Sequence, residues 1–196
     1  MFALRHAVLS FALAALVLAA SACRETGTIR VHSLKFNGVH GVDVDALKSA
    51  LATKASSKLP WGTKRFFDRS QFETDLKRLT AFYSDHGYPR ARITNFDVKL
   101  NQKQDAVDLT VTVDEGAPVV VRSVDYKGFE AIPERRLNAV KRNALLKVGD
   151  PRNKALVLAT QEAALNALRD NGYPYAKVNV DENDGADGLE IGRAHV

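Results

Sequence analysis

The sequence predicts an α+β fold built from two tandem copies of one unit, and two observations carry this prediction. A short phrase occurs twice, at residues 31–38 (VHSLKFNG) and at residues 121–128 (VRSVDYKG). Each phrase is followed by a helical pattern that stops at a Gly-Tyr-Pro, first at residues 87–89 and then at residues 172–174. Because repetition at a fixed spacing marks a duplicated supersecondary unit, we expect neighbouring copies with a shared role.

The opening strand of each unit is expected to contain a β-bulge. In residues 28–36 the apolar parity changes between Val31 and Leu34, so the inward face changes near His32 or Ser33. One extra residue at that point accounts for such a change. The second copy repeats the shift, which indicates a built-in feature of the unit.

Two helices follow the strand in each unit. Asp43 or Asp45 is the expected cap of a short first helix, and Ser70, spaced to Glu73 as in a capping box, begins a longer second helix. An apolar stripe at intervals of three and four runs along this second helix and is expected to pack on a sheet: Phe72, Leu76, Leu79 and Tyr83. In the second copy the first helix starts near Pro133, and the stripe uses smaller residues.

Two strands complete each unit, which gives the order strand, helix, helix, strand, strand. From Val107 to Val113 apolar and polar residues alternate, the pattern of a half-buried strand. The strand before it, at residues 91–98, is less regular, and residues 176–180 are its counterpart in the second unit. The first unit is longer by five residues, which we place in the loop between its helices.

At the C-terminus the alternation starts again at residues 189–191 and breaks at Gly192. The last residues also resemble a peptide encoded by a common sequencing adapter. We therefore expect a second unit that is truncated at its last strand, followed by a non-native tail at residues 192–196.

At the N-terminus, residues 1–22 combine a short basic start, an apolar run and small residues, the pattern of a secretory signal peptide. The run is shorter than the about 20 residues that span a bilayer. Cys23 is the only cysteine, so it forms no disulfide within the chain. Its place after Ser21 and Ala22 resembles a bacterial lipoprotein signal and predicts lipidation of Cys23; ordinary signal-peptidase cleavage nearby is the alternative.

The composition is that of an ordinary soluble globular protein, with 45% hydrophobic and 26% charged residues. The net charge of +5 belongs to a chain dense in both signs and gives no argument for nucleic acid. The five histidines lack metal-ligand spacing, and there is no phosphate-cradling glycine loop or nucleophile elbow. The sequence therefore predicts a binding module with no catalytic residues, no metal site and no cofactor.

The element order, the two phrases ending in glycine, the Gly-Tyr-Pro stops and a joint at residues 114–116 (DEG) together resemble POTRA domains, the polypeptide-transport-associated repeats. The likeness covers about residues 28–191, and residues 75–89 are the most family-like stretch. It implies two units, at residues 28–117 and 118–191, each with a three-stranded mixed sheet that two helices cover on one face.

In outer-membrane protein assembly factors of the BamA and TamA type, such units project into the periplasm ahead of a membrane β-barrel. The resemblance therefore implies a location on the periplasmic side of the outer membrane. It implies unfolded outer-membrane proteins or secreted polypeptides as clients and other assembly-complex subunits as partners. Membrane association would come from the lipid anchor, a C-terminal barrel, or both. A two-partner secretion pore and a periplasmic scaffold with the same repeats are the alternatives.

The resemblance also makes the second strand of each unit the open edge at which an extended client adds by backbone pairing, or β-augmentation. The residues expected at these edges are Arg92, Thr94 and Phe96 in the first unit and Lys177, Val178 and Asn179 in the second. The alternative is that they form solvated edges, which Arg90, Arg92 and a bulge protect from pairing.

The longer first loop mixes aromatic and basic residues and is a second candidate site. Its members are Trp61, Lys64, Arg65, Phe66 and Phe67. Cations beside aromatic rings suit a protein interface or a lipid headgroup surface. The alternative is that these rings cover the bottom of their own domain.

Overall fold

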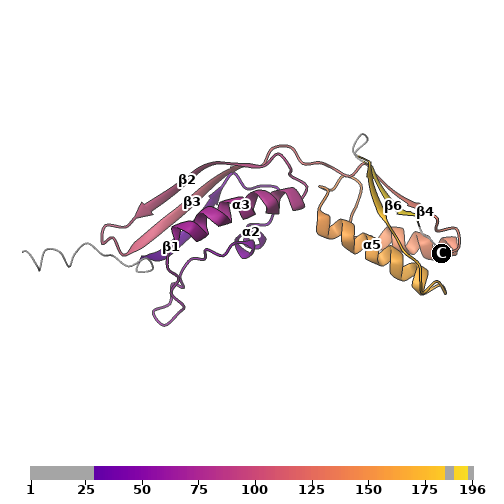
Figure 1. Cartoon of the computed structure of the whole chain (residues 1–196), viewed down its shortest axis with the longest axis horizontal. Coiled ribbons are helices and arrows are strands. Elements are labelled where there is room, and N and C mark those ends of the chain that lie inside the picture. Colours follow the sequence, from indigo (N-terminus) through magenta and orange to yellow (C-terminus); the bar gives the residue numbers. More distant parts are fainter. Residues whose placement is uncertain (1–28, 184–187, 194–196) are drawn as a thin grey trace, which may run out of the picture.

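Two units of the same build follow one another along the chain in the computed structural model, which describes residues 29–183 and 188–193 (Figure 1). With the labels of Figure 1, the first unit consists of β1 (Arg30–Asn37), α2 (Val44–Ala50), α3 (Arg69–Asp85), β2 (Arg92–Leu100) and β3 (Ala106–Asp114). The second consists of β4 (Ser123–Lys127), α4 (Glu134–Asn143), α5 (Lys154–Arg169), β5 (Val180–Asn183) and β6 (Gly188–Arg193). The predicted order of elements is confirmed in both units.

Each unit contains a three-stranded mixed sheet whose last strand in sequence lies in the middle. The strand orders are β1-β3-β2 and β4-β6-β5. The central strand pairs parallel to the first strand and antiparallel to the second. The helices of each unit lie on one face of its sheet (Figure 1). The predicted α+β fold is therefore confirmed, and each sheet has two outer margins.

The expected bulge in the opening strand is present in the first unit. The register between β1 and β3 shifts between Val31 and Ser33, which leaves His32 as the extra residue. A second shift, between Ile93 and Asn95 in β2, accounts for the irregular parity of that strand. In the second unit β4 begins only at Ser123, after the point where the parity changes.

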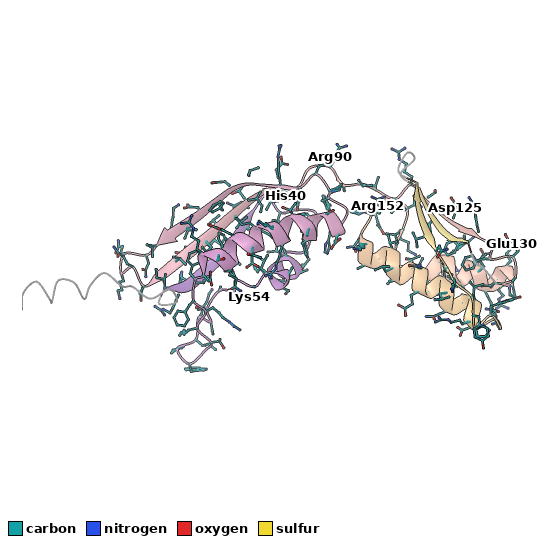
Figure 2. The ribbon with its side chains drawn as sticks, viewed as in Figure 1. His40, Lys54, Arg90, Asp125, Glu130 and Arg152 are labelled. Carbon is teal, nitrogen blue, oxygen red and sulfur yellow. The ribbon has the colours of Figure 1, made fainter. Side chains whose placement is uncertain are left out.

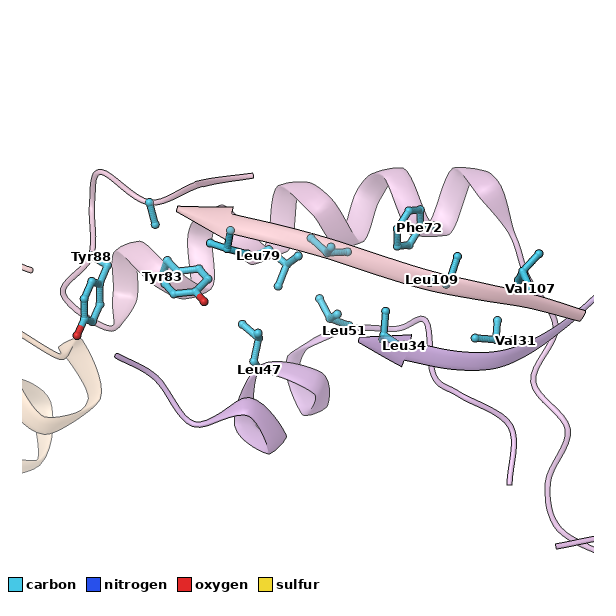
Figure 3. Packing of buried hydrophobic residues seen from close by; sticks show 13 residues of the cluster. Val31, Leu34, Leu47, Leu51, Phe72, Leu79, Tyr83, Tyr88, Val107 and Leu109 are labelled. Atoms are coloured by element: carbon cyan, nitrogen blue, oxygen red, sulfur yellow. The ribbon is translucent and has the colours of Figure 1, made fainter. Parts of the chain in front are cut away.

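The core of the first unit forms where the α3 stripe meets the inward face of β3 (Figure 3). Phe72, Leu79 and Tyr83 are buried against Leu109 and Val111. The second core has the same layout with smaller side chains on the helix. Its buried apolar residues on α5 are Val157, Ala164 and Leu168.

Carboxylate side chains begin the two helices of the first unit. Asp43 caps α2 as expected, since its carboxylate accepts from the Ala46 amide at 2.7 Å. The predicted cap of α3 was wrong. Asp68, in extended conformation before the helix, accepts from the Gln71 amide at 3.0 Å and begins α3 ahead of Ser70.

The Gly-Tyr-Pro after α3 lies at the contact between the two units. Gly87 has a φ of 89°, and a Cβ built there would lie 2.7 Å from the Arg152 backbone nitrogen. The Gly87 carbonyl accepts from the Val119 amide at 2.8 Å, and the Val119 carbonyl accepts from the Arg152 amide at 2.8 Å. Figure 2 places Arg90 and Arg152 on either side of this junction. Glycine is therefore required at position 87 both by the backbone conformation and by the close approach of the second unit.

The buried Glu115 holds the loop that follows β1. Its Oε2 accepts from the amides of His40 and Gly41 at 3.1 and 2.9 Å. The same carboxylate raises the pKa of Tyr83 well above the ordinary phenol range, although burial of the ring is the larger cause. The joint that the sequence singled out at residues 114–116 is thus a packed structural element.

The final strand extends beyond the sequence prediction. β6 runs to Arg193, so Gly192 and Arg193, which the prediction placed in the tail, belong to the strand. Arg193 lies opposite Lys127, and the register between β4 and β6 skips Gly192. The signal segment at residues 1–22, Cys23 and residues 194–196 lie outside the described residues.

Candidate functional site: an open sheet margin and its groove

The outer margin of β2 is the more open margin of the first sheet. Within the described residues, β2 pairs with β3 alone. On the opposite margin, the first part of β1 is covered by the loop between the helices. There the Val31 amide donates to the Arg65 carbonyl, and the Ser56 amide donates to the Val31 carbonyl, both at 2.8 Å. The backbone groups of β2 are therefore the ones that a further strand can reach along the whole strand.

An apolar row of three side chains lies along this open margin. The exposed fractions are 51% for Phe96, 38% for Val98 and 51% for Leu100. The bulge between Ile93 and Asn95 places these residues opposite the inward side chains of β3. They thus lie on the face of the sheet that the helices cover, but at its uncovered edge. An edge strand that exposes apolar side chains in this way is a template for strand addition.

A groove separates the row from the start of α3. Phe96 and Val98 line one side, and Phe67, Phe72, Arg69 and Glu73 line the other, around a cavity of about 270 Å³. The Phe72 and Phe96 rings meet edge to face, with centroids 6.0 Å apart and an interplanar angle of 73°. Alternate side chains of an added strand would enter this groove, while its backbone pairs with β2.

The charges beside the margin are paired with one another. Arg92 contacts the Asp114 carboxylate at 2.7 Å, and Lys99 contacts Asp97 at 2.8 Å. The hydrogen bond from Arg92, followed by that from the Gly116 amide, holds the pKa of Asp114 below its usual value. Asp97 raises the pKa of Lys99. The margin therefore offers backbone groups and apolar surface, with its acids and bases already engaged.

The structure separates the three residues predicted for the first edge. Phe96 lies in the groove, whereas Arg92 forms the ion pair with Asp114. Thr94 is the bulged residue, and its hydroxyl donates to the Thr112 carbonyl at 3.2 Å. The sequence interpretation missed Val98, Leu100 and Phe72. Continuing the apolar parity from Phe96 would have found the first two.

The residues predicted for the second edge lie outside its strand. β5 begins at Val180, so Lys177, Val178 and Asn179 precede it. Val178 is buried in the second core, and its carbonyl accepts from the Gln161 amide group at 2.6 Å. The expected strand at residues 176–180 was placed too early, because the continuous strand starts at Val180 and this segment packs Ala176 and Val178 into the second core. Lys177 forms a single β-bridge.

The predicted loop divides into packed and exposed residues. Phe67 packs against the first core, as the alternative interpretation expected. Trp61 is 82% exposed and Phe66 is 53% exposed, and Lys64 and Arg65 are also exposed. The loop therefore presents a surface of its own beside the groove described above.

Neither a metal centre nor a membrane helix is found in residues 29–183 and 188–193. These residues hold no group of three or more His, Cys, Asp or Glu side chains that could bind a metal ion. None of the helices in this part of the chain has the length and apolar character needed to cross a bilayer.

Comparison with known proteins gives one family. The sequence profile of POTRA, described as surface antigen variable number repeat, matches residues 29–116 and 119–191. The outer membrane protein assembly factor BamA of Neisseria meningitidis serogroup B is 24% identical over 115 residues, which are 58% of this chain and 14% of the relative. The chain spans less than a fifth of the curated relatives it matches.

Solved structures with similarity to this chain include the third to fifth POTRA domains of Haemophilus influenzae BamA. That comparison covers 87% of this chain and 67% of the other at 27% identity, with a TM-score of 0.43. The N-terminal domain of Omp85 from the thermophilic cyanobacterium Thermosynechococcus elongatus is 16% identical, with coverage of 88% and 68% and a TM-score of 0.34.

Proposed function

The chain belongs to the POTRA family, and on this premise we propose that it is the periplasmic region of an outer-membrane protein assembly or insertion factor that binds unfolded clients by β-augmentation at β2. The observation that carries the proposal is the open margin of β2 with its apolar row. A margin of this kind binds through backbone groups, which every polypeptide has. Broad client choice follows from that chemistry.

The alternation of outer-membrane strands fits the groove. Such strands place apolar and polar residues in turn, since one face meets lipid and the other the barrel interior. Added to β2, a strand of this type would direct its apolar side chains toward Phe72 and Phe96 and its polar side chains toward water. Arg92 and Lys99 are already paired with acidic side chains, so the edge does not require a charged client.

Location and partners belong to the same proposal. The N-terminal segment directs export, acylation of Cys23 anchors the chain, and the units lie on the periplasmic side of the outer membrane. Other subunits of an assembly complex are the expected protein partners. Two curated relatives support assembly over two-partner secretion by their names, the Neisseria BamA and a putative outer membrane protein assembly factor of Treponema pallidum.

The test compares two phenylalanines of nearly equal exposure. Phe96→Lys places a charge in the groove, and Phe66→Lys places the same charge on the loop, at starting exposures of 51% and 53%. We expect Phe96→Lys to weaken binding of an alternating apolar and polar strand peptide about tenfold, and Phe66→Lys to change it less than twofold. Fluorescence anisotropy of the labelled peptide measures both.

Backbone pairing is tested on the peptide itself. N-methylation of alternate residues along one edge removes the donors that a β-ladder needs, without changing the side chains. We expect this peptide to bind at least tenfold more weakly to the unaltered protein. Equal affinity of the methylated and unmethylated peptides would exclude strand addition. Equal loss of peptide affinity in Phe96→Lys and Phe66→Lys would exclude the groove as the binding site.

A further inference from the structure

The five extra residues of the first unit lie in the loop that carries Trp61. Two isolated bridges show where they are inserted, because Arg30 pairs with Phe66 and Val120 pairs with Pro151. The second helix of each unit is followed by a glycine, Gly87 in the first unit and Gly172 in the second. Phe66 precedes Gly87 by the same number of residues as Pro151 precedes Gly172. The insertion therefore precedes Phe66, within what we call the Trp61 loop, residues 56–65. Figure 1 shows this segment projecting from the first unit, away from the sheet.

The Trp61 loop is folded by its own hydrogen bonds. At its tip the Gly62 amide donates to the Leu59 carbonyl at 3.0 Å, which closes a tight turn over Pro60 and Trp61. Further back, the Ser57 amide donates to the Thr63 carbonyl at 2.9 Å. Because the turn is already formed, little conformational entropy is lost when the tip docks.

The tip is apolar and its surroundings are basic. Leu59 is 53% exposed and Trp61 is 82% exposed. Between Asp45 and Asp68 the sequence has five basic residues and no acidic one. An indole beside cations suits the boundary between lipid headgroups and acyl chains.

Three of these cations belong to the loop. Lys54, labelled in Figure 2, is engaged elsewhere because its ammonium group donates to the Lys48 and Ser49 carbonyls at the end of α2. Within the described residues, Lys58 and Arg65 have no acidic partner, and Lys64 donates only to the Leu59 carbonyl at 3.3 Å. The loop thus presents positive charge that its own unit leaves uncompensated.

We propose that the Trp61 loop docks on an anionic phospholipid surface, with Leu59 and Trp61 entering the headgroup boundary and Lys58 and Arg65 contacting phosphates. Charge complementarity carries this choice of partner, since the loop has no carboxylate to offer a basic surface. A membrane anchored through Cys23 would lie within reach. The seven residue-to-residue steps from Cys23 to Arg30 span at most about 25 Å, and Arg30 bridges to the base of the loop.

A cavity at the base of the loop adds room for a headgroup. Its volume is about 370 Å³, and its lining includes Lys58 and Lys64 from the loop and Arg30 and His32 from β1. Asp108, the carboxylate in the lining, already accepts hydrogen bonds from His32 and Ser33. The cations around this space that lack an acidic partner within the described residues are therefore the two lysines of the loop.

The experiment uses the chain from residue 23 onward with Cys23→Ser, which contains both cores and lacks an acyl chain. Trp61 is the only tryptophan, so its fluorescence reports on the tip alone. We expect a blue shift on phosphatidylglycerol-containing vesicles, no shift on phosphatidylcholine vesicles, and loss of the shift at high salt.

Matched variants identify the groups responsible. Lys58→Gln with Arg65→Gln should weaken vesicle binding, measured by sedimentation, about twenty-fivefold, because each cation near an anionic surface contributes about fivefold. The pair Lys35→Gln with Lys77→Gln removes the same charge from exposed sites outside the loop and should change binding less than threefold. Trp61→Ser should weaken binding, whereas Tyr175→Ser, at a residue that is 93% exposed in the second unit, should not.

The proposal is overturned if anionic vesicles leave the Trp61 spectrum unchanged at low salt. It is equally overturned if the two charge variants lose binding to the same extent, or if neutral vesicles bind as well. Soluble glycerophosphate that shifts the spectrum without vesicles would show a small-anion site in the basal cavity and would also overturn docking on a bilayer. This inference goes beyond strand addition at β2, and Phe96→Lys should leave vesicle binding unchanged.

Discussion

The two units share one fold, but the buried side chain that binds the loop between the helices differs in its chemistry. At equivalent positions of the second helix, unit 1 has Asp75 and unit 2 has Thr160, and both are buried. Asp75 accepts from the amides of Ala52 and Thr53 at 3.0 and 2.6 Å, whereas Thr160 accepts from the Leu146 amide alone, at 3.3 Å. We call these buried side-chain hydrogen bonds the clamp of each unit. The clamp is a charged carboxylate in unit 1, which has the longer loop, and a neutral hydroxyl in unit 2, which has the shorter loop.

The open margins differ as well. By register, Phe96 lies opposite Val111 and Val98 opposite Leu109, and the matching places in unit 2 are Val180 and Glu182. β5 has only four residues, against nine in β2. The apolar row is thus a property of unit 1, and the two units kept the same fold while the residues at this margin diverged.

The largest expected effect concerns the buried clamp. Asp75→Ala leaves two amides without their charged acceptor and should lower the free energy of unfolding by about 3 kcal/mol. Thr160→Ala removes one neutral hydrogen bond and should lower it by about 1 kcal/mol. Urea unfolding followed by circular dichroism measures both. Equal losses would show that charge at Asp75 adds nothing to the clamp.

A second comparison uses the glycines after α3 and α5. Both have positive φ, 89° at Gly87 and 93° at Gly172, so alanine should cost about 1 kcal/mol of backbone strain at either site. At Gly87 the added methyl also meets the Arg152 backbone, whereas no atom lies within 4 Å at Gly172. We expect Gly87→Ala to cost about 2 kcal/mol and to speed exchange of the Val119 amide hydrogen. Unchanged exchange there would contradict the contact between the units.

Exchanging one residue between the margins should shift client affinity by a smaller amount. Val98→Glu gives β2 the residue that β5 has at that register, and we expect about tenfold weaker binding of an alternating strand peptide, or about 1.4 kcal/mol. Glu182→Val in the same assay serves as the reciprocal change and should not weaken binding. If Val98→Glu binds the peptide normally, the apolar row is not the recognition surface.

The last and smallest expected effect is the change in the free energy of unfolding with pH. It is absent at neutral pH and develops in acid. Burial alone would raise the pKa of Asp75, but hydrogen bonds from Ala52, Thr53 and Arg78 outweigh it and lower the pKa. A carboxyl whose pKa is lower in the folded state stabilises the fold above its unfolded pKa of about 3.9 and loses that contribution as pH falls through the folded value. Unit 1 should therefore weaken before unit 2 below about pH 4.

Hydrogen exchange measured unit by unit can follow this loss, with Asp75→Asn as the control. The variant has no titrating group at the clamp, so it should flatten the pH dependence of unit 1. A pH profile that matches the unaltered protein would assign the acid sensitivity to other carboxyls. Asp105, Asp108 and Asp114, whose pKa values are also lowered by hydrogen bonds, all belong to the same unit.

Much of the fold could be predicted because its signals are local. The bulge at His32 followed from one change of parity, and the α3 stripe followed from spacings of three and four. The cap of α3 was misplaced because Asp68 and Ser70 are both good caps and only the chain path selects between them. The candidate site was predicted in part. Phe96 lies on it, but Phe72 joins it only through packing between a helix and a strand.

The sequence by itself determined the duplication, the order of elements and the points where the helices stop, because these depend on residues a few positions apart. Tertiary structure decided which margin stays open, since the loop from a distant segment covers β1 and not β2. It also decided where β5 begins and that the inserted residues project as the Trp61 loop. Such outcomes depend on partners far apart in the chain, and their competition for the same backbone groups is resolved only when the sheet and helices pack together.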